Sequence, residues 1–107
     1  MAKTSPTKRS LDLLRKDGWP LVAVVEHWNP HAFVRQDLFG IIDVLAVRGN
    51  ETLAVQVTSA SNVSARIKKM SESDALPVLR EAGWTVLVHG WKKNKQGRWE
   101  CRVEDIS

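Results

Sequence analysis

Residues 39–58 decide the fold of this chain, and they read FGIIDVLAVRGNETLAVQVT. Two apolar runs, 39–47 and 52–58, stand on either side of a short polar turn at 48–51. Runs of this length that are rich in valine, isoleucine and leucine and bounded by turn residues are typical of buried β-strands. We therefore predict two adjacent central strands that pair across the turn.

Three polar residues interrupt these apolar runs: Asp43, Gln56 and Thr58. Side chains alternate between the two faces of a strand, so Gln56 and Thr58 share one face, and pairing across the turn can bring Asp43 beside them. A buried carboxylate or amide costs free energy unless it is hydrogen-bonded, paired or bound to a metal. This cluster is therefore the candidate site. The competing interpretations are that Asp43 accepts hydrogen bonds from loop amides and that Thr58 caps the following helix.

The flanking segments predict helices on both sides of this strand pair. Ser5 and Pro6 are typical of a helix start, and Gly18 of its end. We expect a strand at 21–28, a loop or irregular strand at 32–38, a helix at about 63–70, a second helix or a continuation at 75–82, and a hairpin with strands at 84–91 and 98–106. The order α-β-β-β-α-β-β predicts one α/β domain over residues 1–107, with a central mixed sheet flanked by helices and with residues 1–4 disordered.

Composition narrows the class of protein. Sixteen Lys and Arg against twelve Asp and Glu give a formal charge of +4, which favours a polyanionic partner such as nucleic acid. The single cysteine, Cys101, excludes an internal disulfide and is typical of a reducing compartment. No apolar run approaches the ~20 residues that cross a bilayer, and no secretory signal is apparent. We therefore predict a cytoplasmic protein without membrane contact.

The segments Gly40–Asp43 and Gln56–Thr58, with twelve residues between Asp43 and Gln56, resemble the motif of the PD-(D/E)XK nuclease superfamily. Over about residues 7–88 the chain is similar to small archaeal-type Holliday-junction resolvases. The resemblance implies a restriction-endonuclease-like fold, a homodimer, and hydrolysis of DNA, with branched DNA as the family-level substrate. It also implies Mg²⁺ or Mn²⁺ held by the Asp43 carboxylate, the Gln56 side-chain oxygen and the Val57 carbonyl.

Two residues depart from that motif. Gln56 is neutral where the superfamily usually has an acidic residue, and Thr58 stands in place of its lysine. Arg66 and Lys69, on the following helix, are the candidates to replace the missing cation, and Thr58 itself is retained as a candidate at the phosphate.

Two carboxylates are candidates to restore the missing negative charge. Glu26 is expected either as a metal ligand or as an ion-paired glutamate at a strand end. Asp37 is expected either as a ligand or as a turn residue that caps backbone amides. Arg35 either clamps a DNA phosphate or forms a salt bridge with Asp37, and His31 is a candidate contact to phosphate or to the attacking water.

The predicted DNA-binding residues are all basic: Arg35, Arg66, Lys68, Lys92, Lys93 and Lys95. The leading hypothesis from the sequence is a metal-dependent DNA endonuclease. The alternative is a nuclease fold that has lost catalysis and binds DNA or a protein, which the missing lysine and glutamate of the motif favour. A third hypothesis is a purely structural assembly subunit.

Overall fold

The structure, a computed structural model, describes residues 5–107. The disorder predicted for residues 1–4 therefore lies outside the described residues. Along the chain, the elements are α1 (Pro6–Lys16), β1 (Leu21–Val24), β2 (His27–Asn29), β3 (Val34–Gln36), β4 (Val44–Arg48), β5 (Glu51–Ser59), the 3₁₀ turn η1 (Ala60–Asn62), α2 (Val63–Ser71), α3 (Ala75–Glu81), β6 (Thr85–Lys93) and β7 (Trp99–Asp105).

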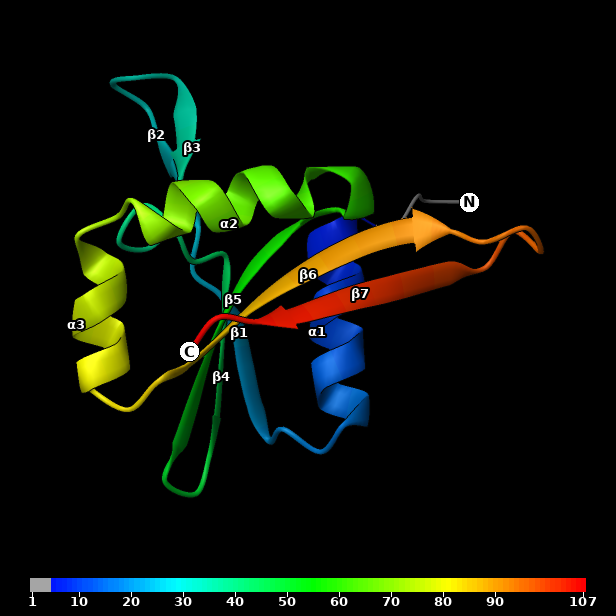
Figure 1. Cartoon of the computed structure of the whole chain (residues 1–107), viewed down its shortest axis with the longest axis horizontal. Helices are drawn as coiled ribbons and strands as arrows, with labels where there is room; N and C mark the ends of the chain where they lie inside the picture. Colours follow the sequence, from blue (N-terminus) through cyan, green and yellow to red (C-terminus); the bar gives the residue numbers. More distant parts are fainter. Residues whose placement is uncertain (1–4) are drawn as a thin grey trace.

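A five-stranded mixed sheet forms the centre of the molecule, in the order β1-β4-β5-β6-β7 (Figure 1). The pair β5 and β6 is parallel and the other pairs are antiparallel. A parallel pair needs a long connection, which η1, α2 and α3 supply. The strands β2 and β3 form a separate hairpin that projects away from the sheet.

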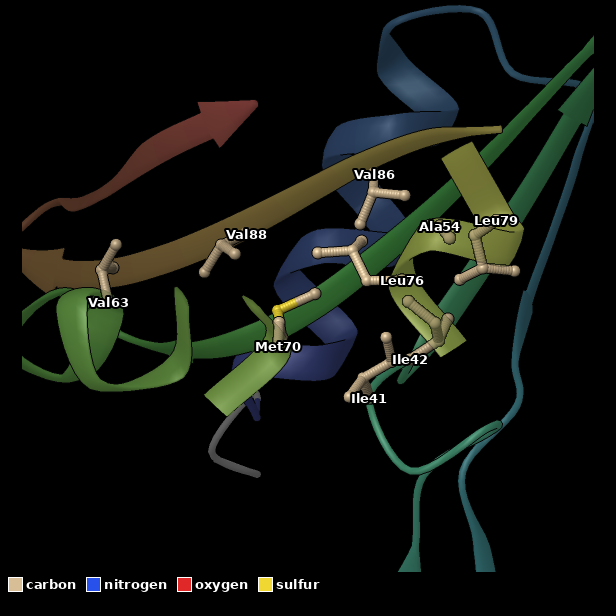
Figure 2. Close-up of a cluster of buried hydrophobic side chains, with 9 residues drawn as sticks. All are labelled: Ile41, Ile42, Ala54, Val63, Met70, Leu76, Leu79, Val86 and Val88. Carbon is tan, nitrogen blue, oxygen red and sulfur yellow. The ribbon is translucent and has the colours of Figure 1, made fainter. Parts of the chain in front are cut away.

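Helices cover both faces of this sheet. On one face, Leu14 of α1 packs among Val44, Ala46 and Val55. On the other face, α2 and α3 contribute the larger cluster shown in Figure 2, with Met70 and Leu76 against Val88. The predicted α/β class, with a mixed sheet flanked by helices, is confirmed. Within residues 5–107, no helix is both long and apolar enough to cross a membrane.

Two of the predicted strands are wrong in their bounds. The run at 39–47 becomes a strand only at Val44, because Phe39 (φ 55°) and Gly40 (φ 78°) turn the chain and a bridge joins Leu38 to Ile42. Likewise, the run at 21–28 is divided between β1 and β2. The order α-β-β-β-α-β-β therefore misses the β2–β3 hairpin. The segment expected at 75–82 as a second helix or a continuation is a separate helix, α3.

Hydrogen bonds among three buried side chains hold α1 against the sheet. Ser10 Oγ accepts a hydrogen bond from Trp91 Nε1 at 2.9 Å and lies 2.9 Å from His89 Nδ1. Because the indole nitrogen only donates, the serine proton is free to be donated to the histidine. Burial lowers the pKa of His89 to about 4, so the ring is neutral at pH 7. Since the Ser10 hydroxyl is fully buried, this pair is a packing device and not an exposed nucleophile.

Gly90 allows the start of α2 to approach β6 closely. A Cβ at this position would overlap Val63 Cγ2 and lie 3.0 Å from Ala60 Cα. We expect Gly90→Ala to lower the free energy of unfolding by about 1–3 kcal/mol, the usual cost of overpacking a core. Urea denaturation measures this loss. Gly97→Ala is a poor comparison because Gly97 has φ 77°, so Ser64→Ala, at an exposed position of α2, is the better one, since surface substitutions usually change stability by less than about 0.5 kcal/mol. A Gly90→Ala variant as stable as the wild type would contradict this packing.

Candidate metal centre

Two local pairings bring Glu26, Asp37 and Asp43 together. The register of the β2–β3 hairpin places Glu26 opposite Asp37 at the base of the hairpin. The bridge between Leu38 and Ile42 then places Asp37 beside Asp43. One carboxylate oxygen from each of the three residues lies within 4.8 Å of the others. The expected placement of Glu26 and Asp37 near Asp43 is therefore what the structure shows, while their role as ligands stays a prediction.

The side chain of Gln56, on β5, contacts two members of this carboxylate group. It is only 1% exposed. Its Nε2 donates to Asp43 Oδ2 at 2.5 Å and to Asp37 Oδ2 at 3.4 Å. The Val57 amide also donates to Asp43 Oδ2, at 2.8 Å. Asp43 and Gln56 thus lie on the same face of the sheet, as the strand alternation predicts.

The environment of Asp43 disfavours its charge. Burial is the main reason that the pKa of its carboxyl rises from 3.8 to about 7, and Asp37 raises this pKa further through a shared hydrogen bond and through its negative charge. Hydrogen bonds from the Val57 amide and from Gln56 act in the opposite direction. Below about pH 7 Asp43 is therefore mostly protonated, and a cation beside it would favour its charged form.

The amide oxygen of the Gln56 side chain is a second feature that points to a cation. Its Oε1 is buried and accepts a hydrogen bond from none of the described residues, although buried polar atoms are normally paired. Rotation about the terminal torsion exchanges the amide oxygen and nitrogen, so this oxygen can face the two aspartates once a cation neutralises them. Carboxylate and amide oxygens are hard donors that suit Mg²⁺, Mn²⁺ or Ca²⁺. The residues present therefore fit a divalent cation.

A cavity of about 540 Å³ opens beside Asp37. Its lining is mostly polar and basic, with residues contributed by the hairpin, the turn that follows it and α2: Arg35, Gln36, Asp37, Gly40, Arg66 and Lys69. Arg66 and Lys69 thus reach the cavity, while their role as replacements for a lysine of the motif stays a prediction. Arg35 Nη1 lies 3.8 Å from Glu26 Oε1, so its salt-bridge partner is Glu26 and the predicted pairing with Asp37 is wrong.

Other predicted site residues lie elsewhere. Thr58 is buried on β5, two residues beyond Gln56. His31 lies at the exposed tip of the β2–β3 hairpin, not beside the carboxylates at its base. Lys68 is exposed on α2 and does not line the cavity. Lys92, Lys93 and Lys95 stand at the end of the β6–β7 hairpin, on the other side of the molecule from β2 and β3 (Figure 1).

Gln36 and Gly40 line the cavity although the sequence did not indicate them as site residues. A glycine within the apolar run was the available signal for Gly40, because an isolated glycine in a strand pattern often marks a break or a close approach. Comparisons with protein-family models, with curated proteins and with solved structures found no match for this chain.

Proposed function

We propose that this chain is a Mg²⁺- or Mn²⁺-dependent endodeoxyribonuclease with a restriction-endonuclease-like fold. One observation carries the proposal: three carboxylates within 4.8 Å of one another adjoin a buried glutamine whose amide oxygen has no partner. The order of helix, strand pair, crossover helices and parallel strand supports the proposed fold. Asp43 directly precedes β4, Gln56 lies on the adjacent strand β5, and their side chains are hydrogen-bonded.

The residues that would hold the cation are Asp43, Gln56, Glu26 and Asp37. The Val57 amide faces Asp43, and because the amide and carbonyl of one residue point to the same side of an extended strand, the Val57 carbonyl is available as the main-chain ligand. A divalent cation bound at such a site supplies an acidified water and an electrostatic partner for a phosphoryl oxygen. The carboxylates also give the site its preference for hard cations.

Positive side chains beside the acidic group suit a phosphodiester. Arg66 and Lys69 project from α2 into the cavity that Asp37 also lines. A guanidinium and an ammonium both bind phosphate oxygens, the guanidinium through paired donors. Because Thr58 has no charge, we assign to Lys69 and Arg66 the neutralisation of the phosphate during cleavage.

Arg66→Ala and Lys69→Ala are each expected to lower kcat/KM for DNA cleavage by about 10- to 100-fold, since each removes a charge-assisted contact to the reacting phosphate. Lys68→Ala removes the same charge from the neighbouring position of α2, outside the cavity, and is expected to change kcat/KM less than about threefold at moderate salt. Initial rates on a fluorescently labelled duplex measure all three. Equal losses of kcat/KM in all three variants would mean that α2 attracts DNA only through its overall positive charge.

The test of the proposed function is cleavage of labelled DNA by the full chain. Linear duplex, single-stranded and four-way-junction substrates are incubated with Mg²⁺, with Mn²⁺ or with EDTA, and products are resolved on denaturing gels. Cleavage with either metal and none in EDTA is expected. No cleavage, together with no rise in melting temperature on adding Mn²⁺, would overturn the proposal.

A nuclease fold without catalysis is the second candidate, and the buried Thr58 at the motif's lysine position favours it. This candidate predicts a rise in melting temperature with Mn²⁺ and salt-dependent DNA binding, but intact DNA after prolonged incubation with the metal. The same assays therefore separate the two functions.

A further inference from the structure

The β2–β3 hairpin rises directly from the carboxylate group and exposes two aromatic rings. It projects from the body of the molecule, as Figure 1 shows. Trp28 is 53% exposed and Phe33 is 77% exposed. Their ring centroids lie 6.4 Å apart with the planes at 71°, so they form an edge-to-face pair. Neither ring contributes to the two buried clusters of the domain, so packing of the core does not explain why aromatic residues stand at these two positions.

These rings share a face of the hairpin with the carboxylates. Trp28 pairs with Arg35 across the hairpin, and Arg35 Nη1 in turn lies 3.8 Å from Glu26 Oε1. Residues two apart on a strand point to the same side, so Trp28 follows Glu26 on that face. One continuous surface therefore runs from the acidic group, past Arg35, to the exposed rings.

We propose that Trp28 and Phe33 form a stacking platform for an unpaired nucleobase, so that the substrate class is DNA with unpaired nucleotides beside the scissile phosphate. This inference rests on the proposed function. At about 3.3 Å per residue, Trp28 stands roughly 7 Å beyond Glu26 along the hairpin. Successive phosphates of a strand lie about 3.4 Å apart in a duplex and farther apart in an extended strand, so the platform meets a base within about two nucleotides of the phosphate at the carboxylates.

The surroundings favour a nucleotide over an apolar protein segment as the occupant. Arg35 stands between the rings and the acidic group, and Arg66 and Lys69 line the adjoining cavity, so aromatic faces and phosphate-binding cations alternate on one surface. Aromatic side chains interleaved with positive charge are the usual means of binding single strands. In an intact duplex the bases are already stacked and do not offer a free face.

The backbone conformation of Phe33 suits a substitution that removes the ring without introducing strain. Phe33 has φ 54°, a conformation that a bulky residue rarely adopts. The turn that leads to it is held by Asn29 Oδ1, which accepts hydrogen bonds from the His31 and Ala32 amides. Because glycine adopts this φ without strain, Phe33→Gly removes a ring and also relieves the backbone strain at this position.

The test measures fluorescence anisotropy of labelled DNA with the full-length chain in Ca²⁺ buffer. The probes are a single strand of about 12 nucleotides, within the range of known site sizes, and the blunt duplex of the same sequence. Trp28→Ala, Trp28→Leu and Phe33→Gly are each expected to weaken single-strand binding about tenfold, since stacking contributes ~1–3 kcal/mol per base. Trp28→Phe, which keeps a ring, is expected to stay within about threefold of the wild type, and so is Leu21→Ala, an exposed apolar residue on β1.

Three results would overturn the platform: affinity unchanged in Phe33→Gly, affinity retained in Trp28→Leu, or equal losses on single strand and duplex. If light scattering shows a dimer that Trp28→Ala converts to a monomer without loss of DNA affinity, the rings are a contact between two copies of this chain. The rise in melting temperature with Mn²⁺ is measured on every variant. If the wild type shows neither this rise nor cleavage of DNA, the metal-dependent nuclease is refuted. If Trp28→Leu or Phe33→Gly keeps the rise and also keeps the wild-type affinity for the single strand, only the platform is refuted.

Discussion

Asp43→Asn is expected to abolish metal-dependent cleavage and, at pH 8 without divalent cations, to melt at a higher temperature than the wild type. The activity loss is expected to be about 1000-fold or more, because the variant lacks the carboxylate most central to the site. The gain in stability follows from the pKa of Asp43, which burial and Asp37 raise to about 7. Asparagine keeps the acceptor for the Val57 amide and adds a donor toward Asp37.

The size of this gain comes from the same pKa. Each pKa unit corresponds to about 1.4 kcal/mol, so relief of the charge is worth on the order of 4 kcal/mol, or roughly 15 °C in a domain of this length. Glu51→Gln is the matched control, because Glu51 is an exposed carboxylate at the opposite end of the β4–β5 pair. Differential scanning fluorimetry in EDTA and initial cleavage rates measure both effects. An Asp43→Asn variant that still cleaves DNA would show that the catalytic centre lies elsewhere.

In metal-free buffer the contribution of Asp43 to the stability of the wild-type chain is expected to be lost as the pH rises from about 4 to about 7, while His89, whose pKa burial lowers from 6.5 to about 4, adds stability over much of the same interval. The folded state retains a proton on Asp43 over this interval, whereas the unfolded chain has released it near pH 3.8. Since the folded state keeps the proton on Asp43, the contribution of Asp43 to the free energy of unfolding falls as the pH rises and is lost above pH 7. Between pH 5 and pH 8 the loss is on the order of 3 kcal/mol.

Mn²⁺ is expected to restore this stability at pH 8 and to have little effect at pH 5, because the proton and the metal compete for the same carboxylate. Urea denaturation at each pH, with Mn²⁺ or EDTA, measures the change. Subtracting the Asp43→Asn profile removes the titration of every other group, and the difference is expected to level off above pH 7. A difference that stays flat from pH 4 to pH 8 would mean that Asp43 is charged in the folded protein without any cation.

The pairing of the two central strands was predictable because its determinants are local. Residues 49 and 50 close the turn between β4 and β5, and strand alternation then places Gln56 on the face where Asp43 approaches it. The N-cap at Ser5 was equally local, and its side chain accepts a hydrogen bond from the Lys8 amide. In each case a few neighbouring residues determine the geometry.

The β2–β3 hairpin was not predictable in the same way. Residues 21–28 read as one valine-rich strand, and the division after Val24 depends on where β4 stops pairing, at Val44. The conformation of Phe33 opposes its own backbone preference and is held by Asn29. The meeting of Glu26, Asp37 and Asp43 requires two pairings at once, so the sequence indicated the candidates but not their convergence.

Anomalous diffraction from a crystal soaked in Mn²⁺ examines the proposed cation site most directly. We expect a manganese peak between Asp43 and Gln56, about 2.2 Å from an oxygen of each side chain, with the glutamine amide turned so that its oxygen faces the ion. Asp43→Asn crystals soaked in the same way are expected to lack the peak. Manganese bound only elsewhere on the molecule, with the Gln56 nitrogen still donating to Asp43, would contradict the metal site on which the proposed cleavage depends.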